Sequence, residues 1–464
     1  MKYQYSKSTV WKMIILLIFS VSSLNAQTIR VPANDPNIAF RGLMYADKSA
    51  DSVVLNRFHP TFWKIATANY DSVKGKTQPG IVISFKTSSP LVVVNFKKRI
   101  NTNANPSSWG IYKNGVSQGY KTSFPLNLTS GTTAPTTWDI VLPYLYGVHF
   151  TGLDLQSGYT TLPLEPEIKK HYIAIGNSIT HGNGQMVTPS NGYATASDSS
   201  YAFILAKNMS WRLYNMAVAG SSITPLIADQ TNPAITNVSA DVITILWGYN
   251  DWNGNKSMVT LSSTYQTLLT KLRGYHPNAQ IYCIMPIFTT TLKPTYGGTP
   301  LYGAIDTLRN TQRRVVNKLI AAGDKKMFVI EGSNLTNATD LYDVVHLNTK
   351  GAVSFAQNLT TIIQQIEVSS GLKELNSNSN IKIYPNPVTG KTLHINLLKV
   401  NEPSIFSIVD LTGKIVFTQK LLITENQTIN LKSLNLKGIY IAKISANSFK
   451  HSQLLTFIEN QASN

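Results

Sequence analysis

Ser178 stands directly after an apolar run and a glycine, in the segment Ile173-Ala-Ile-Gly-Asn-Ser178, and polar and glycine-rich residues follow it. An apolar run of this kind is typical of a buried strand, so the hydroxyl lies at the carboxyl end of that strand. A nucleophile is reachable at such a position. Gly-Asn-Ser is also an ordinary turn sequence, so this segment alone leaves a purely structural role open.

Three further segments occur later in the chain at comparable places. Residues 215–222 follow a second strand candidate, and residues 241–251 end a third one with Gly-Tyr-Asn-Asp. Residues 340–351, which include Asp343 and His346, lie directly before the last helix candidate. Each segment alone could be a loop of turn-forming or helix-capping residues. The four segments in this order form a far more specific pattern.

Residues 171–366 alternate between apolar strand candidates and amphipathic helix candidates. Strands are expected at 171–176, 213–218, 241–247, 280–287 and 326–331, and helices at 200–209, 262–275, 302–322 and 350–366. This alternation predicts an α/β domain with a parallel sheet covered on both faces. Right-handed crossovers place the carboxyl ends of all its strands at one edge, where we expect the functional site.

The four segments resemble blocks I, II, III and V of the SGNH/GDSL hydrolases, and the resemblance covers roughly residues 171–366. It implies a flavodoxin-like three-layer α/β/α fold and a serine esterase with no metal and no other cofactor. Position 177 is Asn where the name-giving motif has Asp. That residue is usually not part of the proton relay, so we expect only a modest effect on local hydrogen bonding.

The resemblance also assigns roles, which agree with elementary chemistry. Ser178 would be the nucleophile, His346 its general base and Asp343 the carboxylate that orients the imidazole. An imidazole suits this role because its pKa is near neutrality, and a carboxylate on its other nitrogen fixes the tautomer. Asp340 is a weaker substitute for Asp343. His181 lies close to the nucleophile in sequence, and we expect it to shape the pocket rather than to act as the base.

The oxyanion hole implied by the resemblance consists of the backbone N–H groups of Ser178 and Gly220 and the side-chain amide of Asn250. A glycine lets the backbone approach closely, and an amide donates without a competing charge. Alone, each of these residues could be an ordinary turn former. Trp252 could line an acyl or sugar pocket, whereas Trp247 is expected in the core.

Residues 27–166 show short β-like runs separated by turn residues, which predicts a β-sandwich or jelly-roll domain. The segments 34–42, 58–63 and 138–154 resemble parts of the β-sandwich that precedes the hydrolase in CE2-like carbohydrate esterases. This looser resemblance implies an O-acetylated sugar or polysaccharide as substrate. A purely structural role for the domain remains the alternative.

Residues 371–380 have the composition of a polar linker, and β-like runs at 381–464 predict a second, smaller β-sandwich. The segments 384–390, 410–414 and 436–440 resemble the C-terminal sorting domain of type IX secretion in Bacteroidetes. This resemblance implies export across the outer membrane by the type IX machinery, followed by release or attachment at the cell surface. A carbohydrate-binding sandwich is the alternative.

At the N-terminus, three lysines precede the apolar run Met13–Val21 and the small residue Ala26, which is the pattern of a signal peptide over residues 1–26. A retained membrane anchor is the lesser alternative, and no membrane span is expected after signal removal. The formal net charge is +18, but the basic residues are scattered without a nucleic-acid motif, which argues against nucleic acid as a partner. The single cysteine, Cys283, lies in an apolar run and is expected to be a buried structural thiol.

These observations predict a hydrolase domain at residues 167–370 between the two β domains. The expected function is that of a secreted or cell-surface esterase that removes O-acyl groups, O-acetyl in preference to long chains, from carbohydrate. Two alternatives stay open: a lipase or lysophospholipase on the same scaffold, and a non-catalytic surface protein that binds glycan.

Overall fold

The computed structural model describes residues 28–60, 72–101, 107–167, 169–182, 195–293, 295–296, 299–300, 303–375, 381–397, 402–410, 414–446 and 450–457. The predicted signal peptide, 1–26, lies outside these residues, as do parts of the segments 58–63, 371–380 and 410–414. The chain divides into two compact units, residues 1–359 and 360–464, which are described separately.

The first unit begins with a β-sandwich. One sheet has the strand order β3-β4-β11-β6-β9 with β1 on β11, and the other has the order β12-β5-β10-β7-β14 with β2 on β5 and β8 on β7. The strands are β1 (Thr28–Val31), β2 (Ala39–Arg41), β3 (Tyr45–Lys48), β4 (Val53–Asn56), β5 (Val82–Thr87), β6 (Leu91–Asn101), β7 (Ser107–Lys113), β8 (Val116–Lys121), β9 (Leu126–Thr129), β10 (Thr136–Val141), β11 (Tyr146–Gln156), β12 (Thr161–Leu162) and β14 (Thr195–Ala196). A short helix, α2 (Ser72–Gly75), precedes β5.

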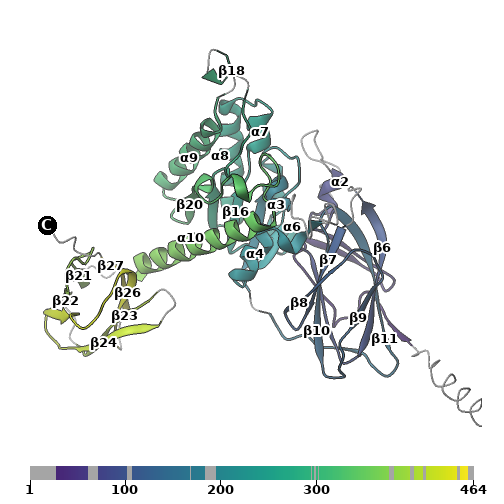
Figure 1. The fold of residues 1–464 in the computed structure, drawn as a ribbon, viewed down its shortest axis with the longest axis horizontal. Coiled ribbons are helices and arrows are strands. Elements are labelled where there is room, and N and C mark those ends of the chain that lie inside the picture. Colours follow the sequence, from purple (N-terminus) through teal and green to yellow (C-terminus); the bar gives the residue numbers. More distant parts are fainter. Residues whose placement is uncertain are drawn as a thin grey trace, which may run out of the picture. The chain divides into compact units, whose positions relative to one another are not determined.

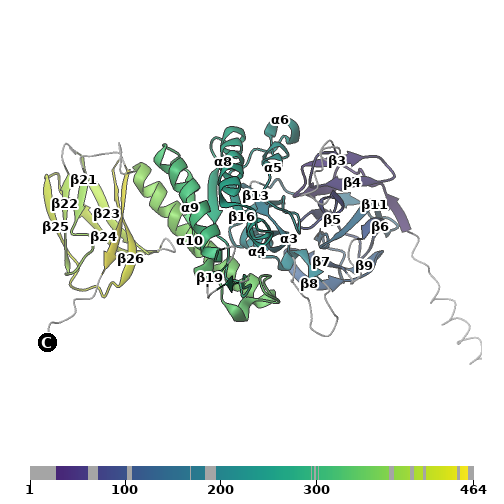
Figure 2. The same ribbon diagram turned by 90° about the horizontal axis from the view of Figure 1, so that it is seen from above.

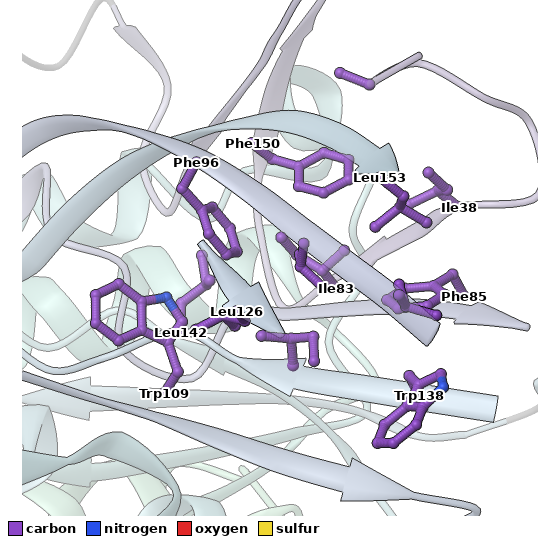
Figure 3. Packing of buried hydrophobic residues seen from close by; sticks show 14 of the residues in the cluster. Ile38, Ile83, Phe85, Phe96, Trp109, Leu126, Trp138, Leu142, Phe150 and Leu153 are labelled. Atoms are coloured by element: carbon purple, nitrogen blue, oxygen red, sulfur yellow. The ribbon is translucent and has the colours of Figure 1, made fainter. Parts of the chain in front are cut away.

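Alternating side chains from the two sheets interdigitate to form the core of this sandwich. Figure 3 shows Phe96 and Phe150 from one sheet above Trp109 and Phe85 from the other. The rings of Phe96 and Phe150 meet edge to face, with centroids 5.9 Å apart. Truncating one of these buried rings to alanine costs about 3–5 kcal/mol. The predicted N-terminal β-sandwich is confirmed.

The pairing of β14 departs from the predicted division of the chain. This strand lies within residues 167–370, yet it pairs in parallel with β7 of the sandwich. Polar contacts continue the connection, since the hydroxyl of Tyr112 on β7 donates to Asp198 at 2.8 Å. This pairing could not be predicted, because β14 has only two residues and so leaves no periodic pattern in the sequence.

The second part of this unit is a five-stranded parallel sheet with the order β15-β13-β16-β17-β20. Its strands are β13 (His171–Gly176), β15 (Arg212–Asn215), β16 (Val242–Leu246), β17 (Gln280–Ile284) and β20 (Met327–Ile330). All five were expected from apolar runs, although β15 and β17 end three residues earlier than predicted. Apolar residues that follow a strand, such as Val218 and Ile287, are buried in loops instead of paired in the sheet.

Helices cover both faces of this sheet, which confirms the predicted three-layer α/β/α architecture (Figure 1). Helix α4 (Tyr201–Asn208) contacts α10 (Thr349–Leu375) through the rings of Tyr201 and Phe355, and α8 (Met258–Tyr275) packs against α9 (Ile305–Ala321). The shorter elements are α3 (Ser178–His181), η3 (Ser197–Ser199), α5 (Leu226–Asp229), α6 (Pro233–Thr236), α7 (Tyr249–Asn253), β18 (Thr295–Tyr296), β19 (Thr299–Pro300), η4 (Gly332–Asn334) and η5 (Ala338–Asp340).

Helix α10 is longer than the predicted segment 350–366, and it occupies residues 371–375 of the predicted linker 371–380. The sequence Gly-Leu-Lys-Glu-Leu accounts for this extension, because Leu, Lys and Glu are good helix formers.

The second unit contains two small antiparallel sheets, with orders β21-β22-β25 and β24-β23-β26-β27 (Figure 2). Their strands are β21 (Ile381–Tyr384), β22 (Thr392–Leu397), β23 (Ser404–Val409), β24 (Ile415–Leu421), β25 (Asn426–Asn430), β26 (Gly438–Ser445) and β27 (Lys450–Phe457). Residues of both sheets, among them Ile395 and Phe406, form one buried cluster. Among the described residues, no helix is long and apolar enough to cross a membrane.

Candidate active site

A sharp connection between β13 and α3 presents the hydroxyl of Ser178. Asn177 caps the helix, and its Oδ1 accepts from the N–H of Ile179 at 3.2 Å. Gly176 is required at this point, since a Cβ there would lie 2.5 Å from the carbonyl oxygen of Leu246 and collide with Thr180. Ser178 is therefore held, half-buried, at the carboxyl end of the strand between β15 and β16. Asn177 keeps the capping role that an aspartate could fill there.

His346 joins Ser178 to Asp343 in a continuous chain of hydrogen bonds. Its Nε2 lies 2.7 Å from the Oγ of Ser178, and its Nδ1 lies 2.7 Å from Oδ2 of Asp343. The side chains of His346 and Asp343 are 18% and 39% exposed, so substrate and solvent can reach the pair. This arrangement allows His346 to remove the Ser178 proton while a carboxylate holds the opposite ring nitrogen.

The loop that carries the pair is fixed by the same carboxylate. Oδ1 of Asp343 accepts from the N–H groups of Val345 and His346 at 2.9 and 2.8 Å. Partial burial raises the pKa of Asp343, but these two N–H donors and the imidazole outweigh it and lower the pKa below its usual value. Asp340, the predicted substitute, is buried and accepts instead from the N–H of Asn337 in the capping box of η5. It therefore supports the loop, while Asp343 is the carboxylate that holds His346.

Gly220 lies in the loop that follows β15, and Asn250 lies in the first turn of α7, which follows β16; these two strands flank β13. Gly220 is exposed and has a φ of +83°, a conformation that favours glycine. Nδ2 of Asn250 donates to the carbonyl of Ser221 at 2.9 Å, which anchors the amide beside Gly220 and leaves its second N–H for another acceptor. The predicted donors thus follow strands that end at the same edge of the sheet as the strand before Ser178.

His181 is fully buried and therefore cannot serve as a base for substrate. Its Nδ1 accepts from the N–H of Ala219 at 3.0 Å, and its ring lies edge to face against Tyr144 at 4.9 Å. Burial, together with the nearby cations of Arg57 and Lys74, lowers its pKa well below the usual value. His181 is thus a neutral support directly behind the Gly220 loop.

Trp252 does not line a substrate pocket, contrary to the prediction. Its side chain is 2% exposed, its Nε1 donates to the carbonyl of Gly303 at 3.3 Å, and the Lys293 ammonium covers its ring at 4.6 Å. Proximity to Asn250 in sequence misled the prediction, because α7 turns the indole inward. Trp247 is buried as expected, and its Nε1 donates to Ser221.

The sandwich contributes residues to the back of the site that sequence reasoning missed. Nη1 of Arg57 donates to the carbonyl of Ala217 at 2.7 Å, and the hydroxyl of Thr77 lies 3.2 Å from Nε2 of His181. One signal was available, because Arg57 is a charged residue directly after the strand-like run Val53–Asn56. Its partners are distant in sequence, so only the fold could identify them.

Comparison with known proteins relates two segments of the chain to known families. Residues 174–353 match the model of the GDSL-like Lipase/Acylhydrolase family, and residues 382–457 match the Secretion system C-terminal sorting domain. No curated protein matches the sequence. Among solved structures, a salicylyl-acyltransferase from a tetracycline biosynthetic pathway is similar at 17% identity and a TM-score of 0.62, with 75% of this chain and 98% of that chain covered.

Two further structures share the fold. A family two carbohydrate esterase from Clostridium thermocellum has 19% identity and a TM-score of 0.52 over 72% of this chain and 99% of that chain. A putative GDSL-like lipase from Bacteroides ovatus has 16% identity and a TM-score of 0.56 over 74% of this chain and 98% of that chain. The predicted resemblances of the α/β domain and of the C-terminal segment are thereby confirmed. Residues 174–353 of this chain thus match the GDSL-like lipase/acylhydrolase family, and residues 382–457 match the C-terminal sorting domains of a secretion system.

Proposed function

We propose that this protein is a secreted or cell-surface serine esterase that removes O-acyl groups, and O-acetyl groups in particular, from carbohydrate or polysaccharide. The observation that carries the proposal is the unbroken hydrogen-bond chain from Asp343 through His346 to Ser178. It lies at the edge of the sheet where Gly220 and Asn250 are also found.

In the first half of the reaction, the Ser178 Oγ attacks the ester carbonyl carbon while Nε2 of His346 takes the hydroxyl proton. The carbonyl oxygen becomes an oxyanion, which accepts from the N–H groups of Ser178 and Gly220 and from the Asn250 amide. The tetrahedral intermediate then collapses. The bond to the sugar oxygen breaks, and the imidazolium of His346 gives its proton to that oxygen.

In the second half, water takes the place of the sugar. His346 removes a proton from the water as it attacks the acyl carbon, and the same donors hold the second oxyanion. Collapse releases the carboxylic acid and returns the proton to Ser178. Asp343 stays ionised throughout, because its function is to hold the imidazole and stabilise its positive charge.

The small Ser- and Gly-rich segments around the nucleophile and the N-terminal sandwich favour an acetyl group over a long acyl chain. A family two carbohydrate esterase has a similar fold, and the match extends over 99% of that chain. This similarity supports carbohydrate as the acyl carrier.

The sorting domain supports the location. A protein that carries such a domain is a substrate of the type IX secretion machinery, so we expect the esterase to act outside the outer membrane. This location fits the predicted signal peptide, residues 1–26.

The test is acetate release from a panel of acetylated plant and bacterial polysaccharides, with Ser178→Ala as the control. The expected result is release by the native protein and none by the variant. Nitrophenyl esters of increasing chain length separate the alternatives, because faster hydrolysis of long chains would identify a lipase. Failure of a serine-directed phosphonate to label the protein would instead support a non-catalytic role. Ester transfer to an added alcohol would reveal an acyltransferase.

A further inference from the structure

Arg57 links the β-sandwich to the active-site loops from behind. It follows β4 directly, and the whole residue is only 1% exposed. Its Nη1 donates to the carbonyls of Asn215 and Ala217, both at 2.7 Å. On the sandwich side, its Nε donates to the carbonyl of Thr77 at 2.8 Å. One planar guanidinium therefore joins the loop after β15 to the loop after α2.

His181 forms a second connection between the same two loops. Its Nδ1 accepts from the N–H of Ala219, so the ring proton is on Nε2. Nε2 lies 3.2 Å from the hydroxyl of Thr77, which itself donates to the carbonyl of Lys74 at 2.5 Å. The hydroxyl of Thr77 thus fixes the tautomer of His181 that Ala219 requires.

Both connections act on the segment that leads into Gly220. Arg57 holds the carbonyls of Asn215 and Ala217, and His181 holds the N–H of Ala219. An oxyanion donor is effective only when it is aimed before the reaction begins, because a donor that must reorient loses its advantage over water. Fixing the residues before Gly220 fixes the direction of its N–H.

We propose that Arg57 is a positioning residue of the esterase, which with Thr77 and His181 holds the loop 215–220 so that the Gly220 N–H points at the oxyanion. The inference rests on the function proposed above. It makes the β-sandwich a part of the catalytic apparatus and not only a cap or a glycan-binding surface.

The charge of Arg57 serves the same purpose. An imidazolium has no lone pair for the Ala219 N–H, so His181 must remain neutral. The guanidinium Nη2 lies 3.5 Å from Nε2 of His181 and opposes its protonation. Lys74 adds a second nearby cation, and Tyr144 packs against the ring.

The test compares kcat and KM for a soluble acetyl ester across matched variants of the full chain. Thr77→Val removes the hydroxyl with little change of shape, whereas Thr77→Ser keeps it. We expect Thr77→Val to lower kcat by about tenfold, while Thr77→Ser stays within about twofold of the native protein. Arg57→Met should lower kcat by about 10²-fold, with Arg57→Lys between it and the native value, and KM should change by less than about threefold.

Arg41→Met is the matched control. Arg41 also belongs to the sandwich and also bridges to the α/β domain, through an ion pair of 2.8 Å with Glu167, but that contact lies near the opposite ends of the strands. We expect its kcat to be unchanged. An equal loss of kcat in Arg41→Met and Arg57→Met would mean that the bridge is merely structural and would overturn the inference.

The outcomes also separate this inference from the proposed function. Full activity of Ser178→Ala would defeat the proposed esterase mechanism itself. An inactive Ser178→Ala together with native kcat in Arg57→Met would defeat only the positioning role. If Arg57→Met does not fold, the comparison of Thr77→Val with Thr77→Ser decides, and equal kcat values in that pair would overturn the inference.

Discussion

Replacing Asp343 by asparagine reverses one hydrogen bond while leaving the loop intact, and it tests the proposed proton relay most directly. The amide oxygen of asparagine can still accept from the N–H groups of Val345 and His346, as Oδ1 does now. The amide nitrogen then takes the place of Oδ2, 2.7 Å from Nδ1 of His346. An NH₂ group donates, so it favours the tautomer with the proton on Nε2, which cannot accept the proton of Ser178.

The structure sets the size of the effect. In a buried serine triad this reversal lowers kcat by about 10⁴. Here the Asp343 side chain is 39% exposed, so water can compete with the amide for Nδ1. We therefore expect kcat to fall by a factor of about 10³, which corresponds to an increase of about 4 kcal/mol in the activation free energy. KM should change little.

The assay is hydrolysis of a nitrophenyl acetate ester near neutral pH, with thermal unfolding as a check of the fold. Asp343→Ala is the matched control, because a water molecule that replaces the carboxylate can still accept from Nδ1. We expect Asp343→Ala to be more active than Asp343→Asn. A kcat for Asp343→Asn above about a tenth of the native value, in a protein with native unfolding behaviour, would refute the assigned role of Asp343.

Three further predictions concern the oxyanion hole, the pH dependence of stability and the core. Asn250→Ala should lower kcat by about 10²–10³ at nearly constant KM in the same assay, and an unchanged kcat would remove Asn250 from the oxyanion hole. Burial lowers the pKa of His276 to about 4, so the unfolded chain binds its proton more readily, and the free energy of unfolding should fall between pH 6.5 and 4. The loss of unfolding free energy from this residue is at most about 3 kcal/mol. Urea unfolding of the native protein and of His276→Gln across this pH range measures it. If the unfolding free energies of the two proteins change with pH in the same way, the assignment to His276 is contradicted. Trp252→Phe removes the hydrogen bond to Gly303 and should therefore lower the free energy of unfolding by about 1 kcal/mol while kcat stays native. A large rise in KM would show instead that Trp252 contacts the substrate.

The sequence predicts those features that depend on local pattern. The apolar run 171–176 forms β13 as expected, and polar residues that follow parallel strands are necessarily carried to one edge of the sheet, which explains why Ser178 and Asn250 could be placed there. Asp343 and His346 could be paired because they lie on one short loop. The tertiary contact between His346 and Ser178 was expected only through the resemblance to a family.

Features that depend on packing between distant segments could not be predicted in this way. The direction of the Trp252 indole is set by the turn of α7 and by contacts with Gly303 and Lys293, none of which leaves a periodic pattern. The connections of Arg57 to Asn215 and Ala217 span the boundary between two predicted domains. Asn215 and Ala217 are 158 and 160 residues away from Arg57 in sequence, so no local pattern indicates these contacts.

The two-residue strand β14 has a consequence for how this protein can evolve. Thr195 and Ala196 lie after the predicted domain boundary at residue 166, yet they pair with β7 in a sheet of the sandwich. A gene fusion or exchange that cut the chain at that boundary would leave an unpaired sheet edge on one fragment and a strand without a partner on the other. Lineages of this enzyme should therefore inherit the sandwich and the hydrolase as one block, while the sorting domain remains free to be exchanged.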